Sequence, residues 1–153
     1  MDGNLTLGLL NLHDAFLNAS LMLKHVQLAP LDVNKPQEFH ISDRGRFERT
    51  WVAYLYVLIE AWESAQMSPV REYIATVTST RGVEDLIAQG RANGDIAKMF
   101  NVRSYMCHRD RREYWDQGRI GVLGQLECHL NIHNAFSKLL LTAMRGVNEK
   151  AKT

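Results

Sequence analysis

Apolar residues recur at alternating steps of three and four along three long segments of the chain, which is the spacing of one helical face. The first face predicts a helix of about seven turns that ends before Pro30. It is formed by Leu5, Leu9, Leu12, Phe16, Ala19, Leu23 and Val26. The second is formed by Phe47, Trp51, Tyr54, Leu58, Ala61 and Ala65, and the last by Leu123, Leu126, Leu130, His133, Ser137, Leu140, Met144 and Val147. Three such faces require a shared core, which predicts a helical bundle.

Turn signals divide the chain between the second and the last of these segments. Ser68-Pro69 combines a helix cap with a first-turn proline and predicts a new short helix. A short helical candidate follows over residues 83–89, and Asn93-Gly94 predicts a turn before a further helix from Asp95. No segment shows the sustained alternation of a strand. We therefore expect an all-α, up-and-down bundle of four long helices plus one or two short helices, with a long loop over residues 30–42.

Length and composition favour one ordinary globular domain over residues 1–153. Of the 153 residues, 46% are apolar and 23% are charged, and the net charge is +1. This balance excludes a largely disordered chain, and any preference for nucleic acid must be local. The apolar run around residues 52–59 is interrupted at Glu60, too short to span a bilayer, and Cys107 and Cys128 fall in helical stretches. We expect a cytoplasmic protein with no leader segment and no membrane partner.

The helix predicted from Asp95 carries an arginine within its apolar face. The apolar members of this face are Ile96, Met99 and Met106. Arg103 stands where the spacing requires an apolar side chain, so we expect it to point inward. An unpaired buried charge is costly, and the guanidinium therefore needs a carboxylate, a carbonyl or a ligand anion. Glu60 and Glu63 on the second helix are candidate partners, with Glu60 the better one.

A run of basic and aromatic side chains follows Arg103. It contains His108, Arg109, Arg111, Arg112, Tyr114, Trp115 and Arg119. Such a run is commonly a solvated helix end, where the helix dipole favours a histidine. It also suits metal-free RNA cleavage, which needs a group to take the 2′-hydroxyl proton, a group to protonate the leaving oxygen, and a cation for the phosphoryl charge. One imidazole cannot fill both proton-transfer roles at once, so this chemistry favours two chains with facing helices.

Residues 103–108 resemble the R-x4-6-H motif of the HEPN superfamily. Its members are all-helical bundles that include many metal-independent ribonucleases and toxins of defence and toxin–antitoxin systems. The resemblance implies a homodimer with one composite site, RNA as the partner, an antitoxin or other protein as a further partner, and no cofactor. Arg103 would contact the scissile phosphate and His108 would act in proton transfer, with Glu60 supporting the arginine. The side chains available to hold the substrate are Arg109, Arg111 and Arg112, with Tyr114 and Trp115 for stacking on bases.

The motif also raises a geometric question. On a straight helix, residues five apart point about 140° away from each other, so Arg103 and His108 do not share one narrow face. A common site then needs long side chains that converge on a cleft, or a distorted turn. In addition, Ser104 stands where many members have an amide or acidic residue.

A second constellation, on the last predicted helix, suggests a metal site. His129 and His133 are four residues apart, which puts both imidazoles on one side of a helix. This pattern resembles the DinB-type four-helix bundles, in which three histidines hold a metal such as zinc or nickel. The third ligand would be His13, His25 or His40. The other interpretation is a pair of hydrogen-bonded core histidines with no metal.

A third hypothesis is a non-catalytic helical interaction protein, such as an adaptor or a partner-neutralising subunit. Arg103 is then a structural member of an ion pair. Other enzyme classes have no support, because the sequence has no Walker-type loop, dinucleotide fingerprint, C-x-x-C pair or nucleophile elbow. The E-x-x-H companions of a di-iron centre are also missing.

Overall fold

The fold is helical throughout the part of the chain that the structure describes. This computed structural model describes residues 3–30, 42–107 and 126–150. Its elements are α1 (Gly3–Leu28), α3 (Asp43–Glu63), the 3-10 turn η1 (Ala65–Met67), α4 (Ser68–Val77), α5 (Arg81–Ala92), α6 (Asp95–Cys107) and α8 (Leu126–Lys150). No strand occurs among these residues, which confirms the predicted all-α class.

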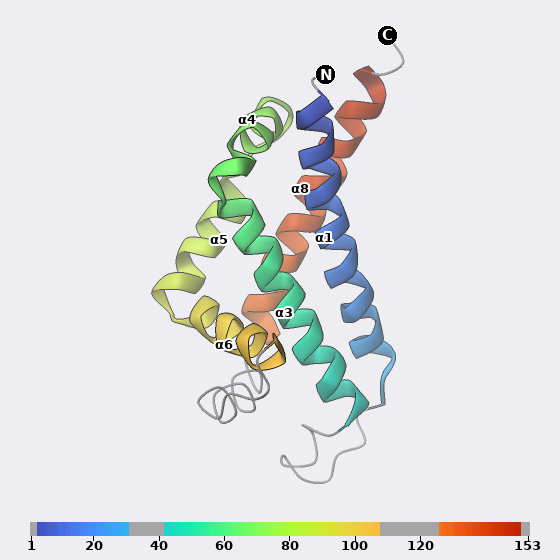
Figure 1. The fold of residues 1–153 in the computed structure, drawn as a ribbon, viewed down its shortest axis with the longest axis vertical. Helices are drawn as coiled ribbons and strands as arrows, with labels where there is room; N and C mark the ends of the chain where they lie inside the picture. The colour runs from blue at the N-terminus through green and yellow to red at the C-terminus, as the bar shows by residue number, and fades with distance from the viewer. Residues whose placement is uncertain (1–2, 31–41, 108–125, 151–153) are drawn as a thin grey trace.

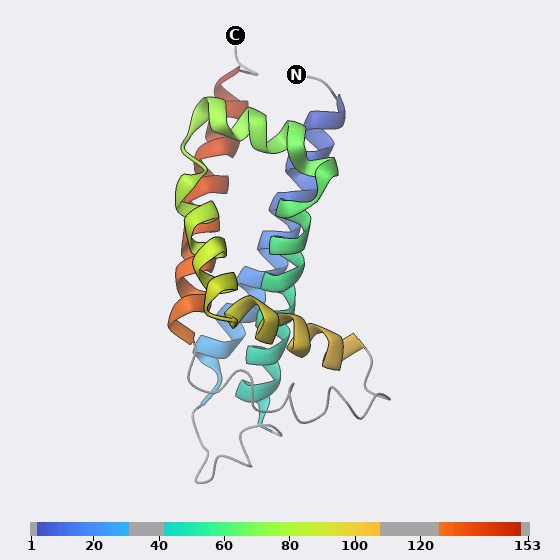
Figure 2. The ribbon, with the colours of Figure 1, turned by 90° about the vertical axis from the view of Figure 1, so that its left-hand side faces the viewer.

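Two antiparallel pairs of helices set the long axis of the molecule (Figures 1 and 2). α1 packs against α3, and α5 packs against α8. α4 crosses one end of these pairs and α6 crosses toward the other end (Figure 2). α1, α3 and α8 have 26, 21 and 25 residues, whereas α4, α5 and α6 have 10, 12 and 13. The described residues thus form three long and three shorter helices, which fits the all-α class but does not confirm the expected up-and-down arrangement of four long helices.

The helix ends follow the capping signals of the sequence. The side chain of Ser42 accepts a hydrogen bond of 3.1 Å from the first-turn amide of Gly45 and so caps α3. Pro69 stands in the first turn of α4, as predicted, but the predicted cap at Ser68 is wrong, because α4 begins at Ser68 and Met67 holds the N-cap position. Between α5 and α6, Gly94 has a φ of +78°, in the left-handed region that favours glycine. The predicted turn at this glycine and the helix that follows it are therefore confirmed.

The core lies between α1, α3 and α8 and is closed by the three shorter helices. Its largest fully buried side chains are Leu9, Leu12, Trp51, Leu55, Leu58, Ile59, Ile74, Ile96, Met99, Ile132, Phe136 and Leu140. Aromatic packing links α3 to α8, where Trp62 meets the ring of Phe136 edge-on at 5.7 Å. Each fully buried large apolar side chain contributes about 1.5–3 kcal/mol, so this core is the main source of stability.

The buried face of α3 is rotated relative to the predicted one. Trp51 and Leu58 are buried as expected, but Tyr54 is 39% exposed. The buried face instead takes in Val52, Leu55 and Ile59. Adjacent residues lie about 100° apart on a helix, so steps of three and four fit two neighbouring faces, and packing decides between them.

Candidate functional site

Arg103 lies on the surface where α6 contacts α3. Its two neighbours in the chain, Val102 and Ser104, are buried, whereas the Arg103 side chain is 32% exposed. The prediction that Arg103 points into the core is therefore wrong. The buried residues Ile96, Met99 and Val102 advance in steps of three, and this places Arg103 at the edge of the buried face of α6.

Glu60 of α3 is the partner of Arg103, as predicted. Nη2 of Arg103 lies 3.8 Å from Oε2 of Glu60. That distance exceeds hydrogen-bond length, and the Glu60 side chain is 52% exposed, so solvent screens the pair. A pair of this kind contributes at most about 1 kcal/mol to folding. The guanidinium can therefore exchange this carboxylate for another anion at little cost.

A second ion pair lies next to the first. Nε of Arg91, in the last turn of α5, donates a 3.1 Å hydrogen bond to Oε1 of Glu63 on α3. Both ion pairs affect the pKa of the Tyr56 hydroxyl. Burial and then the Glu60 carboxylate raise this pKa, while Arg91 and Arg103 oppose the rise. We call Tyr56, Glu60, Glu63, Arg91 and Arg103 the charged cluster. Arg91 was not identified from the sequence, because it lies on α5 and only the fold brings it to α3. Tyr56 lies four residues before Glu60 on the same side of α3, so helical spacing could have placed it beside the predicted site.

An exposed aromatic side chain borders the charged cluster. Phe100 precedes Arg103 by three residues, so both side chains lie on the same side of α6. Phe100 is 40% exposed, and its ring lies 5.7 Å from the ring of Tyr56. The surface beside Arg103 therefore offers a cation together with an aromatic ring, which is the combination that binds a phosphate and an unpaired base.

The remaining residues of the predicted RNA site lie outside the described residues. They are His108, Arg109, Arg111 and Arg112. α6 is described to Cys107, and its C-terminal end extends past α3 (Figure 2). Arg103 is thus placed in the last turns of a helix whose chain continues directly into the predicted basic run.

His133 is a hydrogen-bonded core residue. Its Nδ1 accepts a 3.3 Å hydrogen bond from Nε1 of Trp51, and its Nε2 lies 3.4 Å from Oγ of Ser20. The ring also packs against Phe16, with 5.0 Å between centroids. Burial lowers the pKa of His133, in keeping with a neutral imidazole. Both ring nitrogens are therefore engaged within the fold, as the core interpretation expected.

His129 is buried one turn earlier on α8 and differs from His133 in its partners. Both ring nitrogens are buried, and neither has a hydrogen-bond partner among the residues that the structure describes. The pKa of His129 is lowered from 6.5 to about 4, mainly by burial. The charge of Asp95 raises this pKa and the charge of Lys98 lowers it. The ring stands edge-on to Trp51 at 6.2 Å and serves as a packing element.

The histidines do not form a metal site within the described part of the chain. No group of three histidine, cysteine, aspartate or glutamate side chains suited to a metal occurs there. Of the candidate third ligands, His25 stacks on Phe47 at 4.9 Å, His13 lies on α1, and His40 is outside the described residues. The structure thus brings no third ligand to the H-x3-H pair.

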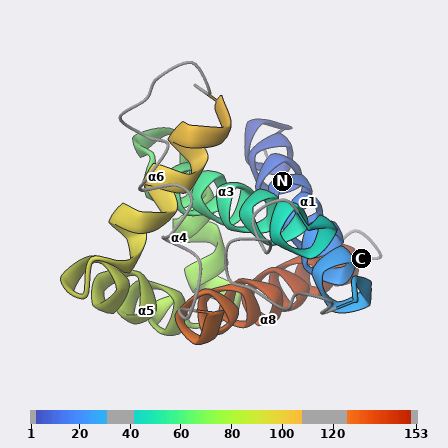
Figure 3. The same cartoon turned by 90° about the horizontal axis from the view of Figure 1, so that it is seen from below.

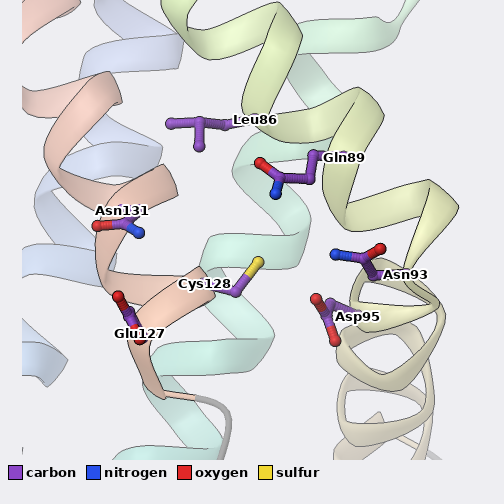
Figure 4. A pocket seen from close by; sticks show the side chains of 7 residues that line it. All are labelled: Leu86, Gln89, Asn93, Asp95, Glu127, Cys128 and Asn131. Atoms are coloured by element: carbon purple, nitrogen blue, oxygen red, sulfur yellow. The ribbon is translucent and has the colours of Figure 1, made fainter.

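A polar cavity of about 230 Å³ opens between α5, α8 and the start of α6 (Figure 4). It is lined by Leu86, Gln89, Asn93, Asp95, Glu127, Cys128 and Asn131. Burial and then the nearby Asp95 carboxylate raise the pKa of the Cys128 thiol, which keeps it protonated. The cavity therefore offers no activated nucleophile.

Comparisons with protein-family models, with curated proteins and with solved structures found no match. Among the helices that the structure describes, none combines the length and apolar character needed to cross a membrane. The chemistry of the surface around Arg103 is therefore the main guide to function.

Proposed function

We propose that this chain is a HEPN-like helical domain that binds RNA and cleaves it without a metal, with Arg103 and His108 as the working pair. The observation that carries the proposal is the state of Arg103. Its guanidinium is partly exposed, it is held by one long ion pair to Glu60, and it lies five residues before His108 at the end of α6. An arginine in this state can bind two oxygens of one phosphate through its planar guanidinium.

The proposed reaction is a transfer within the RNA backbone. The 2′-hydroxyl loses its proton to one imidazole and attacks phosphorus, and the bond from phosphorus to the 5′-oxygen breaks. A second imidazole protonates the leaving 5′-oxygen, which gives a 2′,3′-cyclic phosphate and a 5′-hydroxyl. Arg103 stabilises the extra negative charge on the phosphoryl oxygens. A homodimer with facing motifs supplies the two histidines.

The neighbours of Arg103 have supporting roles in this proposal. Glu60 holds the guanidinium in place until a phosphate replaces it. The exposed ring of Phe100 stacks on an unpaired base, and the tilted ring of Tyr56 packs against it. The side chains that hold the flanking phosphates are Arg109, Arg111 and Arg112.

The biological setting follows from the resemblance alone. A HEPN-like ribonuclease fits a toxin–antitoxin or phage-defence system, with an antitoxin or another protein as partner. The cytoplasmic location predicted from the cysteines suits such a role.

An RNA cleavage assay with matched variants tests the proposal. We expect wild type to cut single-stranded RNA in the presence of EDTA, and His108→Ala to lose cleavage while its helical circular dichroism is unchanged. Arg103→Ala should lose cleavage by at least about 100-fold. Arg91→Ala is the matched control, since it removes the same charge from the other ion pair of the charged cluster. Equal cleavage by wild type and His108→Ala, or a requirement for metal, would overturn the proposal.

The ion pair itself supports a second candidate, a non-catalytic interaction bundle. In that case the contact between Arg103 and Glu60 is purely structural. Arg103→Ala and Glu60→Gln would then lower the melting temperature by the same amount, and no RNA would be cut. Under the leading proposal, Arg103→Ala changes the free energy of unfolding by less than about 1 kcal/mol and loses RNA cleavage.

A further inference from the structure

One side of α1 carries a row of exposed leucines that faces away from the core. Leu7, Leu10, Leu17, Leu21 and Leu28 are 47–70% exposed. With Asp14 and Lys24, they form an unbroken series at steps of three and four, which we call the α1 seam: Leu7, Leu10, Asp14, Leu17, Leu21, Lys24 and Leu28. At 100° per residue the seam lies about 160° around α1 from the buried face. This spacing is that of a coiled-coil contact.

The charges of α1 are confined to the seam. Asp14 and Lys24 are the only aspartate, glutamate, lysine or arginine residues of the sequence between Gly3 and Leu28. Both are exposed. A solvated helix face of this length normally carries many charges, whereas a helix that is apolar on both sides packs against something on each. The seam therefore has the composition of an interface with one acidic and one basic position.

The positions of the two charges select an antiparallel pairing. Asp14 and Lys24 each lie five residues from Ala19, in opposite directions along the chain. If two seams cross at the level of Ala19 along α1, Asp14 of each copy lies opposite Lys24 of the other, so the pair forms twice by symmetry. A parallel pairing would instead place Asp14 opposite Asp14 and Lys24 opposite Lys24, which is unfavourable.

We propose that two copies of this chain associate through an antiparallel, two-fold symmetric contact of their α1 seams. The leucines share the symmetry of the charges. Leu17 and Leu21 lie two residues from the centre and face each other across it, while Leu10 and Leu28 lie nine residues away and close the two ends. The overlap is roughly 30 Å long at 1.5 Å per residue.

The residues that flank the seam are compatible with this contact. Asn11, Asn18, Ser20 and Gln27 border it, as do His13 and His25, and none of these is an aspartate, glutamate, lysine or arginine. No like charges are therefore brought together at the sides of the pairing, where coiled coils usually select their partners by charge. Partner choice then depends on the Asp14–Lys24 pairs.

The inference goes beyond the proposed function, because it uses no residue of the charged cluster. α1 and α6 lie on either side of α3 (Figure 3). The seam contact is therefore distinct from a contact between two α6 helices, and each can be removed without the other. Removal of the seam contact should leave at most the dimer that the α6 contact forms.

Sedimentation equilibrium of the purified chain tests the contact. We expect wild type to have at least twice the 17.5 kDa mass of one chain. Leu17→Lys should weaken the association by at least about tenfold and halve the mass, with unchanged helical circular dichroism, because Leu17 is exposed in the single copy. Leu141→Lys is the matched control, since Leu141 is an equally exposed leucine on α8.

Charge exchange tests the antiparallel register. Asp14→Lys and Lys24→Asp should each weaken self-association, because each places like charges opposite one another. The double variant with both changes should recover wild-type association, and so should a mixture of the two single variants. A parallel seam would respond differently: each single variant and the double variant would keep like charges opposite one another, as wild type does, and only the mixture of the two single variants would associate more strongly than wild type.

Three results would overturn the inference. The first is a wild type that remains a monomer at every concentration. The second is an assembly that Leu17→Lys leaves intact. The third is wild type that stays monomeric and binds phosphatidylcholine vesicles through the seam, with binding lost in Leu17→Lys, which would assign the leucines to a lipid surface.

Discussion

Trp51 of α3 donates its indole N–H to Nδ1 of His133 on α8, over 3.3 Å. This hydrogen bond joins the two helix pairs inside the core, and His133 has its other nitrogen near Ser20 of α1. Three helices thus meet at one neutral imidazole. The contact satisfies polar atoms that would otherwise be buried without partners.

Removal of the indole donor should destabilise the core. In Trp51→Phe the Nδ1 atom of His133 loses its partner, and a smaller ring leaves a cavity. We expect a loss of about 2–4 kcal/mol in the free energy of unfolding, measured by urea titration. Tyr54→Phe on the exposed side of α3 is the control and should change stability by less than about 0.5 kcal/mol. A Trp51 variant as stable as the control would contradict the assigned role.

His129 should make stability fall in acid. Its pKa is lowered in the folded state from 6.5 to about 4, so the unfolded chain binds a proton first as the pH falls. Above pH 6.5 the residue is neutral in both states and has no effect. Between pH 6.5 and 4 the loss grows to roughly 3 kcal/mol and then levels off. His129→Leu should remove this loss, as urea titrations across that range would show.

His129→Leu should also change stability at neutral pH. His129 buries two ring nitrogens without partners, so its replacement by leucine should be neutral or stabilise the fold by about 1 kcal/mol. A loss of several kcal/mol at pH 7 would show instead that the imidazole has a partner.

Glu48 should have the opposite dependence on pH. It is 2% exposed on α3, and burial raises its pKa from 4.5 to about 7 against the opposing charges of Arg44 and Arg49. The folded state therefore holds a proton that the unfolded chain releases as the pH rises. The contribution of Glu48 to the free energy of unfolding is fully present below pH 4.5. It falls by up to about 3 kcal/mol as the pH rises to 7. Glu48→Gln should stabilise at pH 7 and have little effect at pH 4.5.

Gly8 sets the distance between α1 and α4. A Cβ at this position would lie 2.7 Å from Cγ2 of the buried Val70. Gly8→Ala should therefore cost about 1–3 kcal/mol through overpacking, by thermal or urea unfolding. Gly82→Ala on α5 is the matched control. A Cβ there meets nothing within 4 Å, so the higher helix propensity of alanine should stabilise the protein by about 0.5–1 kcal/mol.

The sequence predicted the helices and their ends well, because both depend on local chemistry. The spacing of Leu9, Leu12 and Phe16, the first-turn proline Pro69 and the turn at Gly94 appear as expected, whereas the predicted cap at Ser68 does not. The lengths of the middle helices and the crossing of α4 and α6 depend on packing between distant segments. Local spacing does not contain that information.

The candidate site was predicted in part. The pairing of Arg103 with Glu60 is confirmed, whereas the inward position of Arg103 is wrong by one residue, because Val102 occupies the buried face. Arg91 reaches the charged cluster only through the fold, whereas Tyr56 lies one helical turn from Glu60 on α3. The α1 seam could have been found from the sequence, since its leucines repeat at helical spacing and only two charges interrupt them.

The two crossing helices restrict how anything can reach this protein. α4 spans one end of the helix pairs and α6 crosses toward the other (Figure 2), so the pairs are linked at both ends. Separation of the pairs would break the packing of Val70 beside α1 together with the tilted ring contact between Tyr56 and Phe100. We therefore expect the proposed RNA contact on the outer surface of the bundle, without entry between the helices.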